Sequence, residues 1–238
     1  MPPVELFIGQ KRYSSWSLRP WIMLKHAGID FTEKLTPVEG VGVNDKLLSV
    51  SPSGLVPCVR DADGELIWDS LAICEWAAEH APTGAVWPTD SKARMFSRSI
   101  AAEMHSGFSD LRGLLSMHVA MQLPADSPLP LPPRVASQVA RIIEIWRSAR
   151  ARWGVPSSRP FLFGDFSAAD AMFAPVIFRF QTYRVPIDDP LAKAYYEAML
   201  ADPQMRQWEA AALVETVAPV EKYDAHLLSL GAVRRSAL

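Results

Sequence analysis

Hydrophobic residues in the first 80 positions form short runs that alternate between strand-like and helical spacing. The β-rich runs predict strands at Val4–Ile8, Phe31–Val38, Val56–Arg60 and Glu65–Trp68. Helical spacing predicts helices at Ser14–Ala27 and Leu71–Glu79, with a shorter helical stretch near Leu47. The predicted order is β-α-β-(α)-β-β-α, which is typical of a small α/β unit over residues 1–82.

The pattern changes after a junction near residues 81–91. Apolar residues recur every three or four positions from Ala93 to Leu115, which predicts one long helix over 92–118. The same spacing predicts a second helix from Val135 to Trp153, and five prolines within 123–133 predict a loop between the two. Asp-Pro pairs at 189–190 and 202–203 predict two later helix starts, and no strand pattern is convincing over 92–213. We therefore expect an all-α domain over 92–238.

Composition and charge narrow the class of protein. The chain has 238 residues, 49% of them hydrophobic and 21% charged, with a formal charge of −2. This balance is typical of a globular protein and argues against a mainly electrostatic nucleic-acid binder. The apolar runs are too short to cross a bilayer. The first residues have the pattern of a strand and not that of a signal peptide. We expect a cytoplasmic protein, with Cys58 and Cys74 as buried free thiols.

Several catalytic signatures are missing from the sequence. The five histidines show no metal-ligand spacing, and there is neither a phosphate-binding loop nor a Gly-x-Ser-x-Gly elbow. Gly40-Val41-Gly42 lacks the third glycine of a dinucleotide fingerprint. Zinc hydrolases, NTPases, serine hydrolases and Rossmann oxidoreductases are therefore disfavoured, and we expect no metal.

Four local features carry candidate chemistry. Hydroxyls cluster at 14–17, at the start of a helix, where unpaired N–H groups and the helix dipole favour an anion. Val56-Pro57 opens a strand and can hold a cis bond, and Asp69-Ser70 opens a helix. Simple helix capping or an edge-strand proline would also account for these three. The fourth feature, Ser167 to Asp170, predicts a capping box with a structural role.

In this order, the four features resemble the glutathione transferase superfamily, over nearly the whole chain to about residue 213. The Ser-Ser-x-Ser-x-Arg stretch that starts at Ser14 is most similar to the zeta-class motif. The resemblance implies an α/β thioredoxin-like N-terminal domain (1–82) followed by an all-α C-terminal domain (92–238). It also implies glutathione as co-substrate and a homodimer.

The resemblance assigns roles to individual residues. Ser14 would donate to the glutathione thiol, with Ser15 as its neighbour or as the alternative catalytic donor. Glutathione itself would be bound by Trp16, Ser17, Val56, Pro57, Asp69 and Ser70. Trp16 stands where the zeta motif has cysteine, and Thr182 falls where that class has a substrate-binding arginine. The match to the isomerase class is therefore partial.

Elementary energetics permits a serine-based mechanism. A free thiol has a pKa of about 8.5, and lowering it by about two units requires roughly 2.7 kcal/mol. A hydrogen bond to a charged group contributes about 1.5–3 kcal/mol, and a helix N-terminus adds about 0.3–1 kcal/mol. One serine and the helix amides therefore suffice without a histidine or a metal. Tyr13 is a rival donor, since other branches of the superfamily use tyrosine.

The electrophile is expected between the two domains, beside the helix predicted over 92–118. His105 and Arg112 lie seven residues apart, on one face of that helix, and could meet a polar substrate, as could Arg179 inside an otherwise apolar helix. Trp16 and Met117 are further candidates, while Phe108 is expected to face the core. Residues 221–230 predict either a short helix over the site or a mobile tail.

The leading hypothesis is a glutathione transferase that adds the activated thiol to a small electrophile, as in detoxification. A glutathione-dependent isomerase of the maleylacetoacetate or maleylpyruvate type would use the same thiolate. The third hypothesis is a non-catalytic binding module with this fold.

Overall fold

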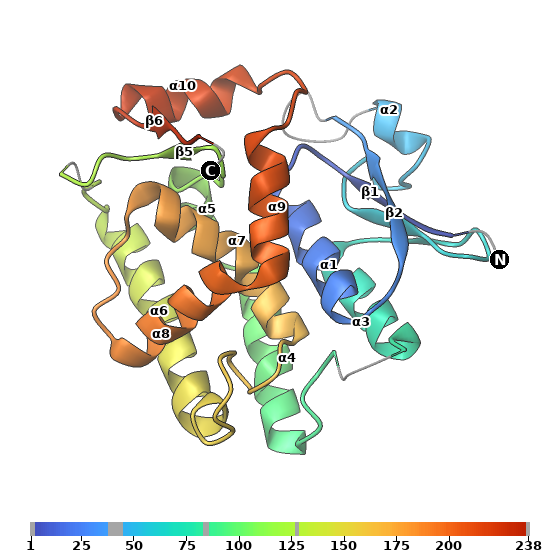
Figure 1. The fold of residues 1–238 in the computed structure, drawn as a ribbon, viewed down its shortest axis with the longest axis horizontal. Helices are drawn as coiled ribbons and strands as arrows, with labels where there is room; N and C mark the ends of the chain where they lie inside the picture. Colours follow the sequence, from blue (N-terminus) through green and yellow to red (C-terminus); the bar gives the residue numbers. More distant parts are fainter. Residues whose placement is uncertain (1–2, 38–44, 83–85, 127–128, 237–238) are drawn as a thin grey trace.

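A computed structural model describes residues 3–37, 45–82, 86–126 and 129–236. Its first part contains β1 (Val4–Ile8), α1 (Ser15–His26), β2 (Phe31–Leu35), α2 (Asp45–Leu48), β3 (Cys58–Arg60), β4 (Leu66–Ile67) and α3 (Ser70–His80). Next come α4 (Ser91–Ser106), α5 (Ser109–Leu114), β5 (Met121–Gln122), α6 (Pro133–Ala149) and the π-helical turn η1 (Arg150–Gly154). The chain continues through α7 (Ala168–Tyr183), α8 (Pro190–Ala201), α9 (Pro203–Leu213), α10 (Glu221–Ser229) and β6 (Val233–Arg234). Figure 1 shows the sheet on one side of the molecule and the helical part on the other.

The main sheet has the strand order β2-β1-β3-β4. β1 pairs with β2 in parallel and with β3 antiparallel, and β4 lies antiparallel at the edge. The helices α1 and α3 pack against each other and against these strands. This arrangement confirms the predicted thioredoxin-like fold class and the β-α-β-α-β-β-α order. β3 begins at Cys58, two residues later than predicted, after the cis Val56–Pro57 bond.

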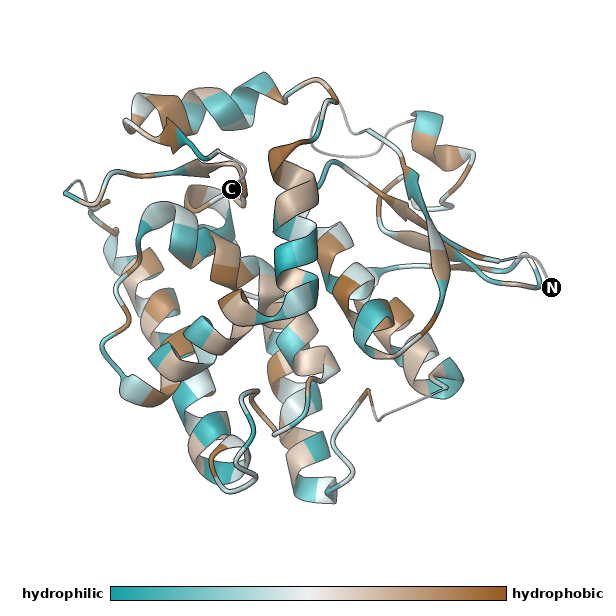
Figure 2. Ribbon diagram, viewed as in Figure 1, coloured by the Kyte–Doolittle hydropathy of each residue, from teal (hydrophilic) through white to brown (hydrophobic). Residues whose placement is uncertain are grey.

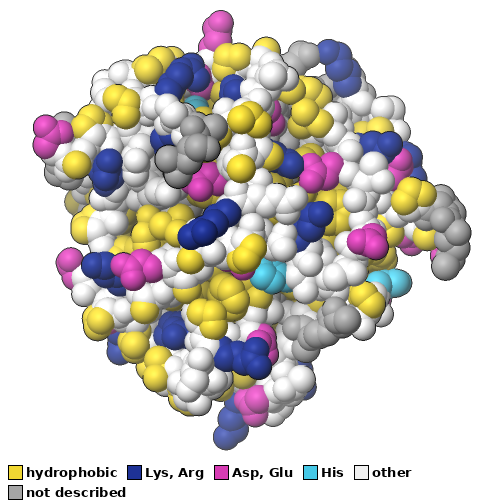
Figure 3. All heavy atoms as spheres, viewed as in Figure 1, with side chains coloured by type: hydrophobic (Ala, Val, Ile, Leu, Met, Phe, Trp, Pro, Cys, Tyr) yellow, Lys and Arg dark blue, Asp and Glu magenta, His cyan; other side chains and the backbone are white. Residues whose placement is uncertain are grey.

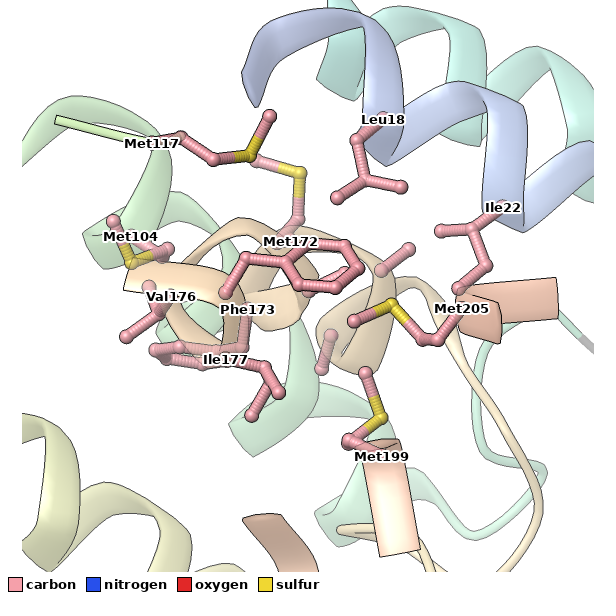
Figure 4. Packing of buried hydrophobic residues seen from close by; sticks show 14 of the residues in the cluster. Leu18, Ile22, Met104, Met117, Met172, Phe173, Val176, Ile177, Met199 and Met205 are labelled. Atoms are coloured by element: carbon pink, nitrogen blue, oxygen red, sulfur yellow. The ribbon is translucent and has the colours of Figure 1, made fainter. Parts of the chain in front are cut away.

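The core centres on α7, where 15 of the 16 residues are buried. α7 packs against α1 from the first part and against α4 and α8 from the second. Figure 4 shows Leu18 and Ile22 of α1 lying over Met172 and Phe173 of α7. The outer helices carry both hydrophobic and hydrophilic residues (Figure 2), as amphipathic helices do. The start of α1, and with it the hydroxyl cluster at 14–17, is therefore fixed against the helical part.

The prediction of one continuous helix over 92–118 is wrong. α4 ends at Ser106, and α5 begins at Ser109 after a turn in which Phe108 has a φ of 58°. A Cβ atom on Gly107 would lie 2.7 Å from the carbonyl oxygen of Glu103, so only glycine fits there. Both pieces bury their apolar faces in the same core, and the spacing therefore continues across the break. His105 and Arg112 consequently belong to different helices.

Replacing Gly107 with alanine is expected to lower the free energy of unfolding by about 1–3 kcal/mol, because the new methyl group overlaps a backbone oxygen. Gly113→Ala is the matched control on α5, since nothing lies within 4 Å of a Cβ placed there. Alanine at that helical position is expected to be neutral or stabilising by up to about 1 kcal/mol. Urea unfolding of both variants checks the pair, and equal effects would contradict the steric argument.

The prediction of no strand over 92–213 is also incorrect in one place. β5 pairs antiparallel with β6, at Met121–Arg234 and Gln122–Val233. Two residues are too few to leave a recognisable alternation in the sequence. This small ladder ties the end of the chain to the helical part.

Both cysteines are free and buried, as predicted. Within the described ranges, no helix combines the length and apolar character needed to span a membrane. On the face seen in Figure 3, hydrophobic, basic and acidic side chains are interspersed.

Candidate functional site

A cavity of about 640 Å³ opens between the sheet part and the helical part. The start of α1, the loop before β3 and the end of β4 form one side. The α4–α5 region, α7 and α10 form the other. Its lining includes Ser14, Ser15, Trp16, Val56, Pro57, Asp69, His105, Arg112 and Arg179. The structure thus brings nine of the eleven predicted site residues to one cavity, whereas Ser17 and Ser70 are fully buried and are not among its lining residues. A second cavity, of about 700 Å³ beside the end of α1, contains none of them.

Ser14 precedes α1, and a short chain of hydrogen bonds orders its hydroxyl. The Gly9 N–H donates to Ser17 Oγ at 3.1 Å, and Ser17 Oγ lies 2.7 Å from Ser14 Oγ. When the Ser17 hydroxyl donates to Ser14 Oγ, the Ser14 proton is left for a ligand in the cavity. Ser17 is fully buried, so its geometry suits orienting Ser14 better than the direct glutathione contact we predicted.

Ser15 is more enclosed than Ser14. Its hydroxyl accepts a hydrogen bond of 3.3 Å from Nη2 of Arg179, and its N–H donates to the Tyr13 carbonyl at 2.9 Å. The Ser15 oxygen therefore already has a cationic partner in Arg179. Both serines lie at the N-terminal end of α1, where unpaired amides favour an anion.

Tyr13 is directed away from a role as thiol donor. Its hydroxyl donates to Oδ1 of Asp224 at 2.8 Å. Burial and the neighbouring Asp224 carboxylate raise the pKa of Tyr13 to about 12. Since its proton is held by a carboxylate, the geometry favours the serines over this rival.

Arg112 and Arg179 line the cavity, and Arg19 is buried behind Trp16 on α1. The Trp16 ring lies 4.1 Å from the Arg19 guanidinium and 5.3 Å from that of Arg112. Arg179 donates to the carbonyl oxygens of Leu115 and Arg112. Burial, together with neighbouring arginines, lowers the pKa of Arg19 to about 9, and burial lowers that of Arg179 to about 10. All three arginines remain charged near neutral pH, so the cavity attracts anions.

Asp69 and His105 both line the cavity and contact each other. Nε2 of His105 lies 3.1 Å from Oδ2 of Asp69, whose Oδ1 accepts from the Leu71 N–H at 3.0 Å. Ser70 follows at the start of α3, fully buried, and its Oγ has no hydrogen-bond partner among the described residues. An unpaired buried hydroxyl beside a helix N-terminus has donor capacity to spare for a ligand.

Sequence reasoning missed three contributors. Arg19 stands within the quoted motif but was given no role in the site, because a buried arginine leaves no periodic signal. Tyr223 lines the cavity, and Asp224 holds Tyr13; both lie on α10, which is the short helix we considered for 221–230.

Of the further residues considered from the sequence, Met117 lines the cavity, and Phe108 is buried outside its lining. Over the described part of the chain, no group of three or more potential metal ligands occurs.

Comparison with known proteins identifies relatives of both parts. Residues 13–80 match the family model of the glutathione S-transferase N-terminal domain, and residues 131–199 match that of the C-terminal domain. Maleylacetoacetate isomerase from Rattus norvegicus is 25% identical over 194 residues, 79% of this chain and 83% of that protein. A probable maleylacetoacetate isomerase from Caenorhabditis elegans is 31% identical over 100 residues, 42% of this chain and 45% of that protein.

Two solved structures show the same fold. A glutathione transferase homologue from Burkholderia, solved with bound glutathione, superposes with a TM-score of 0.65 at 24% identity and covers 87% of this chain and 96% of its own. A bacterial zeta-class maleyl pyruvate isomerase gives a TM-score of 0.59 at 21% identity and covers 90% and 100% of the two chains.

Proposed function

Because the chain belongs to the glutathione S-transferase family, which models of both family domains show, we propose that it is a glutathione transferase that activates the thiol with Ser14. The observation that carries this proposal is the cavity itself. It joins the Ser14 hydroxyl at the start of α1 to the cis Val56–Pro57 bond and to the start of α3. Ser15 is the alternative donor within the same cluster.

We propose one orientation for glutathione in this cavity. Its γ-glutamyl end would lie toward Asp69 and Ser70, where the unpaired Ser70 hydroxyl and the start of α3 suit a carboxylate. Its cysteinyl backbone would pair with Val56. The thiol would then lie at Ser14.

The reaction begins when the thiol loses its proton to solvent, leaving a thiolate that accepts a hydrogen bond from Ser14. The sulfur attacks the electrophilic carbon, a C–S bond forms, and a leaving group departs with the electron pair of its bond. The positive field of Arg19, Arg112 and Arg179 further favours the thiolate over the thiol.

Calorimetric titration with glutathione, followed by turnover of an activated chloronitrobenzene, tests this function. We expect saturable binding and release of chloride that depends on glutathione. S-methylglutathione is the matched control, since it retains the tripeptide but has no thiol to ionise. Binding without turnover of any electrophile would instead support a non-catalytic module.

A second candidate function is isomerisation of an anionic substrate through a transient thiol adduct. Three guanidinium groups around the cavity favour it, and two relatives are maleylacetoacetate isomerases. Arg112 is the most accessible of the three arginines, and its Nε has no partner among the described residues. Arg112 is therefore the residue we propose for binding a substrate carboxylate.

Arg112→Ala is expected to lower kcat/KM about 10–100-fold for an unsaturated carboxylic acid, because a charged hydrogen bond is worth about 1.5–3 kcal/mol. Its methyl ester has the same reactive carbon without the charge, and we expect less than about a threefold change for it. Arg98→Ala removes a half-exposed arginine of α4 that does not line the cavity and serves as the control. Equal losses for the acid and its ester would contradict carboxylate binding by Arg112.

We further propose a cytoplasmic homodimer with the domain boundary between residues 82 and 92. Membership of the family supports the dimer. Light scattering at several protein concentrations measures the oligomeric state.

A further inference from the structure

The carboxylate of Asp224 is buried where α10 meets the turn that precedes α1. Its Oδ1 accepts hydrogen bonds from the Tyr13 hydroxyl at 2.8 Å and from Nε2 of His118 at 2.9 Å. Its Oδ2 accepts from Nη2 of Arg234 at 2.8 Å. Asp224 follows the residues that match the C-terminal family model, which end at 199.

The groups around Asp224 favour the ionised form of its carboxyl group. Burial opposes ionisation, but hydrogen bonds from His118, Tyr13 and Arg234 outweigh it, and the pKa of Asp224 lies below its ordinary value. Burial lowers the pKa of His118, which is therefore neutral near pH 7. Because a carboxylate only accepts, the neutral His118 ring carries its proton on Nε2.

The same C-terminal segment holds the rest of the turn. Oε1 of Glu215 accepts from the Lys11 N–H at 2.8 Å, and Oε2 accepts from the Arg12 N–H at 3.3 Å. The Tyr13 ring lies between Tyr223, stacked at 5.5 Å, and His118, edge-on at 5.0 Å. Three consecutive residues before Ser14 are thus held by side chains from residues 215 to 224.

The turn transmits this restraint to the serines. The Tyr13 carbonyl accepts from the Ser15 N–H at 2.9 Å, and the N–H groups of Tyr13 and Ser14 both donate to the Gln10 carbonyl. A displaced Tyr13 would therefore change the backbone that places both hydroxyls.

We propose that Asp224 is a positioning residue, which holds Tyr13 and through it the turn that aims Ser14 at the glutathione thiol. The catalytic part of this role rests on the proposed function; the holding of the turn does not. Tyr13 then connects Asp224 of α10 to the turn before the catalytic serine and takes no direct part in thiol activation.

Two variants separate hydrogen bonding from packing. Asp224→Leu has a similar size but no acceptor, whereas Asp224→Asn keeps an acceptor oxygen for Tyr13 and His118. Arg234→Ala removes the more exposed partner of Asp224 and leaves the two buried bonds intact. The measurements are the ultraviolet titration of bound glutathione thiolate and amide hydrogen exchange of residues 10–18 and 221–229.

For Asp224→Leu, we expect the pKa of the bound thiol to rise by about one unit, a tenfold loss of thiolate at neutral pH. Exchange over residues 10–18 should accelerate in the same variant. Asp224→Asn and Arg234→Ala should stay close to the wild type in both measurements. If Asp224→Leu does not fold, Tyr13→Phe breaks the same bond from its other end and is expected to reproduce the shift.

Three results would overturn the proposal. The first is a loosened α10 in Asp224→Leu with unchanged thiol titration and unchanged exchange over 10–18. The second is a lower thiol pKa in Asp224→Leu, as expected if the released Tyr13 hydroxyl is itself the thiol donor. The third is an equal rise of the thiol pKa in Asp224→Leu and Asp224→Asn, which would indicate that the charge of Asp224, and not its hydrogen bonds to Tyr13 and His118, matters.

Failure of the proposed function gives a different pattern. The wild type would then bind glutathione with an unshifted thiol, or would not bind it. The exchange measurement still decides whether Asp224 holds the turn, because it needs no ligand.

Discussion

Ser14→Ala is expected to raise the pKa of the glutathione thiol by about one to two units and to lower kcat/KM about 10–100-fold at neutral pH. The variant loses one hydrogen bond to a charged sulfur, worth about 1.5–3 kcal/mol, and each pKa unit corresponds to about 1.4 kcal/mol. The helix amides at the start of α1 remain, so part of the activation should survive. Ultraviolet titration of the bound thiolate measures the shift directly.

Ser116→Ala is the matched control for this experiment. Ser116 also lines the cavity, but its hydroxyl pairs with the Tyr183 hydroxyl at 3.0 Å. An unchanged thiol pKa in Ser14→Ala, together with a raised one in Ser15→Ala, would transfer the role to Ser15. Restored turnover at high pH in Ser14→Ala is also expected, since the thiol then ionises without assistance.

Asp170→Ala should be the most destabilising of the substitutions considered, lowering the free energy of unfolding by about 3–5 kcal/mol. The Asp170 side chain is fully buried at the start of α7. It accepts from the Ser167 N–H at 2.8 Å, the Ser167 hydroxyl at 2.7 Å and the Leu162 N–H at 3.1 Å. Alanine leaves these buried donors without partners, at about 1–3 kcal/mol each. Chemical denaturation measures the loss.

Asp165→Ala provides the control five residues earlier. Its side chain is 75% exposed, and its ion pair among the described residues is with Arg159, so we expect a change below about 0.5 kcal/mol. Comparable losses for the two variants would show that the capping box is not the cause.

The loss in Asp170→Ala should also depend on pH. Burial raises the pKa of Asp170 from 3.8 to about 6 in the folded protein. A raised carboxyl pKa means that folding takes up a proton, so this group stabilises the fold most at low pH and less as pH rises toward 6 and beyond. The destabilisation by alanine is therefore expected to be larger at about pH 5 than at about pH 7. The opposite dependence would contradict this account.

Local patterns in the sequence were sufficient to predict most elements of the fold. The capping box at Ser167 and Asp170 and the Asp-Pro helix starts depend on neighbouring residues, and all of these elements are present. The break at Gly107 was missed because its cause is a contact between backbone atoms, while the hydrophobic spacing continues across it. The β5–β6 ladder joins segments more than 100 residues apart, and local patterns carry no information about such a pairing.

The candidate site was likewise predicted only in part. The hydroxyl cluster, Val56-Pro57 and Asp69-Ser70 were recognisable as short motifs, and the structure places most of these residues around one cavity. Arg112 was identified by its seven-residue spacing from His105, and Arg179 as a charged residue inside an otherwise apolar helix. The hydrogen bond between Tyr13 and Asp224 spans 211 positions, so the engagement of the Tyr13 hydroxyl could be seen only in the folded chain.

The burial of α7 on every side has a consequence for how this sequence can diverge. A surface helix accepts polar replacements on its outer face, but α7 has almost no outer face, since 15 of its 16 residues are buried. Nearly every substitution along it changes the volume or the polarity of a packed interior. Descendants of this chain should therefore keep the residues of α7 while the exposed positions of α6 and α8 drift. A library that randomises one helix at a time would recover far fewer folded variants from α7 than from either of them.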